Sequence, residues 1–401
     1  MWWSSVHRRR WCTLLMLITM VFTIQRLVLR LRDGGTTINN SVIISPKFIS
    51  MISNSRIGPS ANRVVRKLPA SSPNKTCHPE KYGRIAMFTY VTRRLAKSVY
   101  LRSLATQLCY AKRMNYTHIL LYEEDAVKNA QFRVNCERYQ SIYYRKQCAV
   151  RETLLAHPEF TYLFVLDADT GVSNPGHCLE DWIGDPTVDL HFYERFFLWE
   201  PCACNYIVKN TPYSYEFLEK WLAFHTKQPR EGVTSFDNGA LLTLLLQEVY
   251  PDRPEYSKKC NKLWHSNEYV EYAFCADGYL RRRMQSSPTI RLVQRAHAWV
   301  MDRHILRDHW SVYNFFNHGW KTGQIANGTN WALSRIPEND ECDPHVRKEW
   351  PLRAELRLDE SGMRQHLANE EKKLQTKYAI STEPDVRECW PQCDAQKAKQ
   401  F

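Results

Sequence analysis

Short apolar runs and longer amphipathic stretches alternate through the middle of the chain. Three strand-like segments lie at residues 85–90, 117–122 and 162–166, and the third is a continuous apolar run, typical of a strand buried on both faces. The segments between them, residues 95–114 and 137–156, have the apolar spacing of helices, and Val99, Leu104 and Leu108 fall on one side of the first. This strand–helix order predicts an α/β fold with a parallel sheet and right-handed crossovers.

The pattern becomes less regular toward the C-terminus. Residues 204–209 are short and extended, residues 213–226 have helical spacing, and residues 238–249 predict a strongly apolar helix. We expect one folded domain over residues 77–363, a length that suffices for one large core. A charged helical extension is expected to follow at residues 364–401.

The N-terminus carries a basic segment followed by fourteen residues without a charge, at 11–24. That length is short of the ~20 residues that a membrane helix usually needs, so a cleaved signal peptide is an alternative. Because no small-x-small cleavage pattern follows, we expect a signal-anchor transmembrane helix at residues 11–31. Residues 1–10 would be a cytoplasmic tail and residues 32–76 a flexible stem. This predicts a single-pass type II protein of the Golgi or ER membrane with a lumenal domain, or a secreted form if the segment is cleaved.

Cysteine usage and glycosylation motifs favour the same secretory route. The chain has thirteen cysteines, of which Cys12 lies in the apolar segment, and an even number follow it. Asn-x-Ser/Thr motifs occur at Asn39, Asn74, Asn115 and Asn327. This combination predicts disulfides in an oxidising compartment, although the pairings cannot be deduced. A thiolate metal site at Cys202/Cys204 and Cys389/Cys393 is the alternative, and it is weaker because no second pair has zinc-site spacing.

The net charge is concentrated at one end of the chain. Of the formal charge of +13, residues 1–76 carry +11, which leaves +2 for the rest. A basic chain ordinarily suggests nucleic acid as a partner. Because the folded part is close to neutral, we exclude a nucleic-acid partner.

Two carboxylates, Asp167 and Asp169, directly follow the third apolar run. In parallel sheets, ligands bind beyond the carboxyl ends of the strands. Carboxylate oxygens in such a place can hold a hard divalent cation. The pattern suits a metal-bound diphosphate, and so a nucleotide-sugar transferase, but it is also frequent by chance, so the surrounding motifs decide.

A series of spaced motifs surrounds the two carboxylates. They are Lys146, Arg151, Pro158-Glu159, Leu166-Asp167-Ala-Asp169, Asn174-Pro175, Asn205–Asn210, Phe217–Trp221 and Asp237–Leu241. In these motifs the chain resembles the α-galactosyl, α-mannosyl and xyloglucan xylosyltransferases, which have the GT-A fold. It resembles even more a nematode-expanded family of anchored proteins related to them. The resemblance covers roughly residues 83–325. It implies a Rossmann-like nucleotide-diphospho-sugar transferase domain of the GT-A type.

The resemblance also implies a metal site. Asp169 would bind Mn²⁺ or Mg²⁺ directly, and Asp167 would bind the metal or the ribose of a UDP- or GDP-sugar. His318 would be the third ligand, with His304 and His309 as rivals. In the family a glycine follows this histidine by three positions, whereas here the glycine is adjacent.

Further roles follow from the same resemblance. Lys146 and Lys321 would lie against the diphosphate as donor-binding residues, or Lys146 would neutralise the carboxylates. Lys146 is equally well explained as a solvated helix lysine. Asp237 and Asn238 would be catalytic residues beneath the sugar ring, and Asn238 stands where the family has Gln. The alternative for Asp237 is that it caps the following helix, since Asp is a preferred N-cap.

The predicted activity is transfer of a hexose or pentose from the nucleotide sugar to a glycan or glycoconjugate acceptor. Retention of configuration is implied by the resemblance alone. One alternative is a catalytically inactive glycan-binding or scaffold relative of the same fold. Another is a haloacid-dehalogenase-type phosphatase, because residues 184–189 mimic its late acidic motif. That motif begins only seventeen residues after Asp167, too close for the strands that should intervene.

Overall fold

The computed structural model describes residues 67–72, 75–229, 236–283, 287–325, 331–380 and 385–393, and all of them lie in one compact unit. The expected tail, anchor and most of the stem fall outside these residues, as do Asn39, Asn74 and Asn327. Among the described residues, no helix has the length and apolar character needed to span a membrane.

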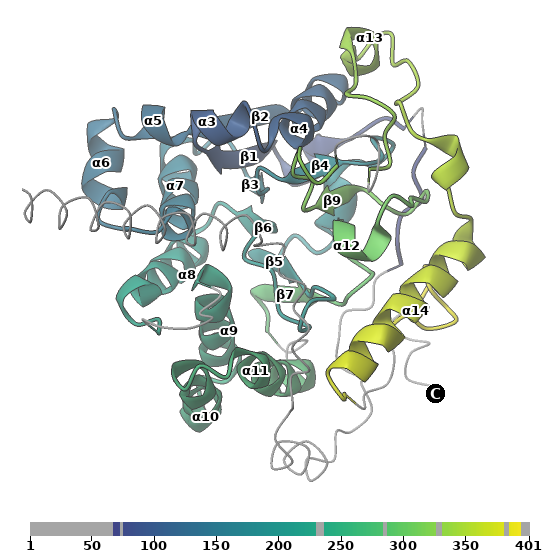
Figure 1. Cartoon of the computed structure of the whole chain (residues 1–401). Helices are drawn as coiled ribbons and strands as arrows, with labels where there is room; N and C mark the ends of the chain where they lie inside the picture. Colours follow the sequence, from purple (N-terminus) through teal and green to yellow (C-terminus); the bar gives the residue numbers. More distant parts are fainter. Residues whose placement is uncertain are drawn as a thin grey trace, which may run out of the picture. The chain divides into compact units, whose positions relative to one another are not determined.

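A six-stranded sheet forms the centre of the fold (Figure 1). Its order is β2 (Thr117–Tyr122), β1 (Ile85–Val91), β3 (Tyr162–Val165), β6 (Tyr206–Lys209), β5 (Leu190–Tyr193) and β7 (Ile290–Val293). The first three strands are parallel, which confirms that prediction. Beyond them the sheet is mixed, because β6 runs antiparallel to both β3 and β5. The sheet is therefore parallel only in part.

A second, three-stranded sheet lies beyond the end of β3. It consists of β4 (Thr170–Val172), β9 (Phe316–His318) and β8 (Val300–Asp302), in that order. Its register pairs Thr170 with His318 and His318 with Asp302. The small sheet thereby brings a late part of the chain next to the Asp167–Asp169 turn.

The helix expected at residues 95–114 is divided into α3 (Arg93–Ala96) and α4 (Leu101–Arg113). Leu104 is buried, but Leu108 is 46 % exposed, so the expected apolar side is only partly the packed side. The buried face of α4 instead contains fully buried polar residues, Ser103, Thr106 and Gln107. These residues pack against the turn that carries the two aspartates, as described below.

The helix expected at residues 137–156 begins later, as α7 (Ile142–Ala156). Ser141 is its N-cap, and the Ser141 hydroxyl accepts a hydrogen bond from the Tyr143 N–H. Two shorter helices, α5 (Glu123–Ala126) and α6 (Ala130–Cys136), precede it. The start of α7 thus projects two tyrosines, Tyr143 and Tyr144, from its first turn.

The helices expected at residues 213–226 and 238–249 are present after β6, and two further helices that were not expected follow them. The segment contains α8 (Pro212–Leu222), the short η3 (Ala223–Thr226), α9 (Phe236–Val249), α10 (Pro254–His265) and α11 (Tyr269–Arg283). The last three gather into one group (Figure 1), in which α9 is buried over most of its length. Asp237 is the second residue of α9, not the residue before it. The predicted alternative of a simple N-cap therefore does not describe its position.

Several short elements complete the described chain. They are η1 (Pro79–Tyr82), η2 (Leu179–Trp182), α12 (Arg303–Leu306), α13 (Asn339–Cys342) and η6 (Ala354–Leu356), followed by the long α14 (Glu360–Lys377). Met363 and Leu367 of α14 are fully buried, and the backbone N–H of buried Leu68 donates to the Pro391 carbonyl. Packed residues thus lie on both sides of the boundaries expected after residues 76 and 363.

The twelve cysteines beyond the N-terminal segment form six disulfides, which confirms that prediction. The pairs are Cys77–Cys178, Cys109–Cys342, Cys136–Cys148, Cys202–Cys204, Cys260–Cys275 and Cys389–Cys393. A thiolate metal site at Cys202/Cys204 and Cys389/Cys393 is thereby excluded, because a disulfide sulfur is not a thiolate.

Candidate functional site

The turn that carries Asp167 and Asp169 is held by buried polar side chains of α4. The Ser103 hydroxyl donates to the Ala168 carbonyl at 2.5 Å, and the Gln107 amide donates to the Asp167 carbonyl at 3.1 Å. Such hydrogen bonds are needed because a buried backbone group without a partner is costly. The polar face of α4 therefore fixes the backbone from which both carboxylates project.

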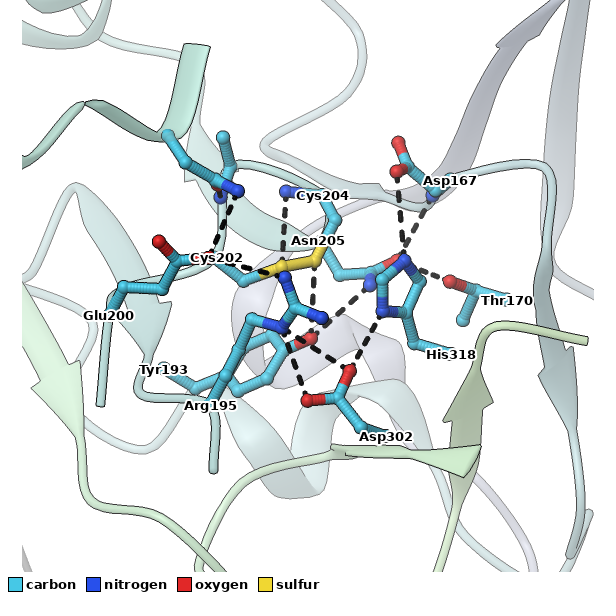
Figure 2. Close-up of a disulfide and its surroundings, with 12 residues drawn as sticks. Asp167, Thr170, Tyr193, Arg195, Glu200, Cys202, Cys204, Asn205, Asp302 and His318 are labelled. Carbon is cyan, nitrogen blue, oxygen red and sulfur yellow. Dashed lines mark hydrogen bonds and ion pairs between the residues drawn. A yellow bond between two sulfur atoms is a disulfide. The ribbon is translucent and has the colours of Figure 1, made fainter. Parts of the chain in front are cut away.

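Asn205 fixes the same turn from the opposite side, at the start of β6. Its side-chain oxygen accepts hydrogen bonds from the Asp167 N–H at 3.0 Å and from the Thr170 hydroxyl at 2.8 Å. The Asn205 amide also donates to the Tyr193 hydroxyl at 3.3 Å. Figure 2 shows Asn205 between Asp167 and the tyrosine. Asn205 is fully buried, so its contribution is to position the turn.

Asp167, Asp169 and His318 come together at this turn. Their nearest ligand atoms all lie within 4.8 Å of one another. The His318 Nε2 atom is 3.4 Å from an Asp169 oxygen and 3.8 Å from an Asp167 oxygen. Two carboxylate oxygens and one imidazole nitrogen form a donor set that suits a divalent cation.

The other nitrogen of His318 is engaged by a buried carboxylate. Asp302, at the end of β8, lies 2.9 Å from the His318 Nδ1 atom (Figure 2). Burial favours a raised pKa for Asp302, but the charge of Arg195 and the His318 hydrogen bond outweigh it and hold the pKa well below its usual range. An ionised Asp302 favours a proton on His318 Nδ1, which leaves Nε2 on the side of Asp167 and Asp169. Burial would lower the pKa of His318, but the charge of Asp169 and the Asp302 hydrogen bond raise it overall.

Gly319 explains why the glycine is adjacent to the histidine in this chain. Its φ of +97° belongs to the left-handed region that favours glycine. This turn brings the N–H groups of Gly319 and Trp320 to the Asp169 carbonyl, at 3.0 and 2.7 Å. It also places the Lys321 Nζ atom 3.8 Å from an Asp169 carboxylate oxygen.

Lys146 connects two carboxylates at the base of the site. Its Nζ atom is 2.7 Å from an Asp167 oxygen and 3.9 Å from an Asp237 oxygen. Burial alone would lower the pKa of Lys146, but the two carboxylates raise it overall. Burial also raises the pKa of Asp237, against the opposing influence of Lys146. Lys146 is 5 % exposed, so the description as a solvated helix lysine is wrong.

The Cys202–Cys204 disulfide encloses Ala203, whose backbone forms hydrogen bonds with two residues of the site. The Ala203 carbonyl accepts a hydrogen bond from the Lys146 Nζ atom at 2.9 Å. The Ala203 N–H donates to the Asn238 side-chain oxygen at 2.7 Å. Figure 2 shows the disulfide between Glu200 and the Asp302–His318 pair. A three-residue disulfide loop thus fixes the backbone that Lys146 and Asn238 contact.

The Asn238 side chain contacts the protein through both its oxygen and its nitrogen. Besides accepting from Ala203, its amide donates to a Glu200 oxygen at 3.3 Å. Glu200 is itself buried, and it accepts a hydrogen bond from the Tyr269 hydroxyl at 2.6 Å and pairs with Arg195 at 3.3 Å. Asn238 therefore holds the disulfide loop of residues 202–204 in place through its hydrogen bonds to Ala203 and Glu200.

Of the seven residues expected at the site, excluding glycosylation motifs, none lies elsewhere in the fold. Asp167, Asp169, His318, Lys146, Lys321 and Asp237 form one continuous group, and Asn238 joins it through Ala203. Of the rivals, His309 packs against His366 at 5.1 Å between ring centres. Neither His304 nor His309 belongs to any candidate ligand group among the described residues. Asn115 is exposed in the turn after α4, where its glycosylation stays a prediction.

Sequence reasoning missed the residues that orient the site, chiefly Asp302, Arg195, Gln107 and Glu200. Asp302 reaches His318 only because β8 pairs with β9, and no local sequence pattern predicts that pairing. The only sequence signal for Gln107 was a polar residue within the helical spacing of α4. The residues that hold the site in place are therefore not the residues that stand out in the sequence.

Glu200 gives a testable pH dependence of stability. Burial raises the pKa of Glu200 from 4.5 to about 7. Between those values the unfolded chain ionises Glu200 and the folded chain does not, so rising pH favours unfolding. We expect the Glu200→Gln variant to lose less stability than the wild type between about pH 4.5 and about pH 7.5. Urea unfolding at both pH values measures this; parallel pH profiles for the two proteins would refute it.

Comparisons with known proteins give a family and a likeness to solved structures. No curated protein matches the chain. Among solved structures, the chain is similar to a glycosyltransferase involved in the glycosylation of the major capsid of PBCV-1. The likeness has a TM-score of 0.35 and 11 % sequence identity, over 59 % of this chain and 93 % of that one. Residues 107–334 match the family described as "Protein of unknown function, DUF273". Since this match spans more than half of the 401 residues, the chain belongs to the DUF273 family.

Proposed function

We propose that the protein is a metal-dependent glycosyltransferase that moves a hexose or pentose from a nucleotide sugar to a glycan or glycoconjugate acceptor. The observation that carries this proposal is the group formed by Asp167, Asp169 and His318, with Asp302 on the far side of the imidazole. A carboxylate behind a histidine is the usual arrangement around a metal-binding imidazole. The donor set fits Mn²⁺ or Mg²⁺, which take oxygen and nitrogen ligands.

A bound cation would supply charge stabilisation for the diphosphate leaving group. Asp169 and His318 would hold it, and Asp167 would hold it or the ribose of the donor. Lys321 is 44 % exposed at its side chain, so it is available to lie against the diphosphate as a point charge. This assigns binding of a UDP- or GDP-sugar to the carboxyl end of β3.

In this proposal Asp237 acts on the sugar itself. Its carboxylate is buried beside Lys146 and accepts a hydrogen bond from the Gln147 amide at 3.0 Å. Gln147 orients the carboxylate, and Lys146 keeps it from being an isolated buried charge. We propose that Asp237 stabilises positive charge on the sugar or orients the acceptor. Asn238 holds the neighbouring disulfide loop around Ala203 in place. Retention of configuration belongs to this proposal, as does residence of the domain in the Golgi or ER lumen behind an N-terminal anchor.

The disulfide around Ala203 gives a prediction about positioning. Removing a disulfide that closes so short a loop costs roughly 1–2 kcal/mol by loop entropy, against about 5 kcal/mol for one like Cys109–Cys342, which spans 233 residues. We expect the double variant Cys202→Ala/Cys204→Ala to remain folded and to lose about tenfold in donor hydrolysis, because Lys146 and Asn238 lose a fixed partner. Urea unfolding and hydrolysis rates, measured on the same preparation, test this. Unchanged hydrolysis would show that the disulfide does not position the site.

The proposed function is tested by donor hydrolysis. The purified full-length chain is incubated with a panel of UDP- and GDP-sugars, with and without Mn²⁺, and the released nucleoside diphosphate and sugar are measured. Hydrolysis of at least one donor that depends on Mn²⁺ is the expected result. Release of phosphate from simple monoesters would indicate a phosphatase instead. Binding of glycans without hydrolysis of any donor would indicate an inactive relative of the fold.

A further inference from the structure

A cavity of about 500 Å³ opens beside the candidate site, at the start of α7. Three segments line it: residues 138–144, residues 225–228, and Phe236 at the start of α9. Its volume lies within the range of small-molecule sites, about 300–1,000 Å³. Its lining includes neither Asp nor Glu among the described residues. This excludes it as a second cation site.

Two stacked aromatic rings stand at this cavity. The rings of Tyr143 and Phe236 lie 5.0 Å apart between centres, with an angle of 23° between their planes. Their side chains are 43 % and 45 % exposed, so both offer apolar surface to a ligand. Partly exposed aromatic rings of this kind are typical of binding surfaces that contact both apolar and polar groups. A sugar ring is a ligand of this kind, because it has an apolar C–H face as well as hydroxyl groups.

The polar lining is held in place by the protein. The Tyr144 hydroxyl donates to the Gln228 side-chain oxygen at 3.2 Å, which turns the Gln228 amide so that its N–H groups stay available as donors. His225 packs edge-on against Tyr139, with 4.8 Å between ring centres. Arg138 has no carboxylate partner within the described part of the chain, although it donates to the Tyr139 hydroxyl at 2.9 Å. Amide and guanidinium donors of this kind suit hydroxyl groups.

Two residues that line the cavity are close in sequence to residues of the candidate site. Tyr143 lies one helical turn before Lys146 on α7, and Phe236 directly precedes Asp237. Burial raises the pKa of Tyr143, and the charges of Asp237 and Asp167 add to this effect, so both carboxylates lie near its hydroxyl. A molecule in the cavity would therefore meet the proposed reaction centre on the side of Lys146 and Asp237.

We infer that this cavity binds a sugar residue of the acceptor glycan, with the ring packed on Tyr143 and Phe236 and its hydroxyl groups bonded to Gln228 and Arg138. That the bound saccharide is the acceptor rests on the proposed transfer reaction. That the cavity binds a saccharide rests on the cavity residues alone. Tyr143 and Phe236 are binding residues in this account.

The experiment measures saccharide binding to the purified full-length chain by ligand-observed NMR, without donor or metal. The probes are methyl glycosides of neutral hexoses, pentoses, N-acetylhexosamines and uronic acids, with UDP as a competitor. We expect at least one glycoside to bind, and Tyr143→Ala and Phe236→Ala each to weaken its binding at least tenfold. Tyr143→Phe keeps the ring and should retain binding. Leu155→Ala, a change at a 53 % exposed residue of the same helix, is the matched control and should have no effect.

The outcomes test the saccharide assignment of the cavity separately from the proposed transfer reaction. If no glycoside binds, or if binding is insensitive to both Tyr143→Ala and Phe236→Ala, the cavity assignment is overturned. If UDP competes in a manner that depends on Tyr143, the cavity belongs to the nucleotide and the saccharide assignment is overturned. Donor hydrolysis is assayed separately: saccharide binding through Tyr143 in a chain that hydrolyses no donor supports the cavity and contradicts the transfer reaction.

Discussion

The Asp169→Ala variant is expected to lose at least about 100-fold in Mn²⁺-dependent donor hydrolysis, which corresponds to about 2.7 kcal/mol of barrier height. The reason is that one of the two carboxylates facing His318 Nε2 disappears, and a cation would keep only one carboxylate and the imidazole. The backbone carbonyl of residue 169, which accepts from Gly319 and Trp320, is untouched by the change. The variant should therefore fold and be secreted like the wild type. Secretion level and the hydrolysis rate at saturating Mn²⁺ measure the two expectations.

The matched control is Asp340→Asn, which removes an exposed carboxylate that pairs with Lys348. It should leave hydrolysis and secretion unchanged, because exposed ion pairs contribute little. A fully active Asp169→Ala protein would refute the metal assignment. A variant that fails to fold is distinguished by its loss of secretion, and Asp169→Asn, which keeps the shape of the side chain, then tests the charge alone.

The Lys146→Met variant is expected to lose about 3 kcal/mol of unfolding free energy at neutral pH, since removing one partner of a buried pair leaves a buried charge without compensation. Lys146 contacts Asp167 and Asp237, and the Lys146 and Asp237 side chains are less than a tenth exposed. The methionine fills the space of the alkyl chain but supplies neither charge nor a donor to Ala203. Urea unfolding at neutral pH measures the loss.

The loss should depend on pH with a definite sign. Burial raises the pKa of Asp237 even beside Lys146, and removing the lysine raises it further. At a pH below the ordinary carboxyl range, Asp237 is neutral in both the folded and unfolded chains, so the deficit of the variant should be smallest there. It should grow as the pH rises and the unfolded chain ionises first. Lys220→Met, at a half-exposed lysine paired with Glu216 and Glu248, is the control and should cost about 1 kcal/mol or less. Equal losses in the two variants would contradict the role assigned to Lys146.

The strands that carry the site were visible in the sequence for a physical reason. β1 and β3 are buried on both faces, so every position along them except Thr89 is apolar and the signal is local. The two aspartates stand out because they interrupt such a run at its carboxyl end. The mixed half of the sheet was not visible, because strand direction depends on pairing between distant segments.

The polar face of α4 shows why the rest was harder to predict. A search for apolar spacing favours Leu108, which is exposed, over Ser103, Thr106 and Gln107, which are buried. These three are buried because the turn after β3 needs hydrogen-bond partners; Thr106, for instance, accepts from the Val172 N–H at 2.9 Å. Demands of this kind arise only once the chain is folded.

Motifs that drew attention in the sequence do not all lie at the site. The Asn174 side chain accepts from the Gly176 N–H at 3.1 Å and donates to the Ser71 hydroxyl at 2.8 Å, so it stabilises a turn. Arg151 pairs with Glu152 at 2.7 Å and with Glu219, so it joins α7 to α8. These residues support the scaffold. His318, by contrast, lies beside the carboxylates because Thr170 of β4 pairs with it across the small sheet.

We propose that Asp167, Asp169 and His318 hold a divalent cation that a nucleoside diphosphate shares. It is tested most directly by the electron paramagnetic resonance signal of free Mn²⁺, titrated with the full-length chain in the presence and absence of UDP. We expect one bound Mn²⁺ per chain, tighter binding when UDP is present, and loss of this binding in Asp169→Ala. Failure of the wild type to bind Mn²⁺ under either condition, or equal binding by Asp169→Ala, would contradict it.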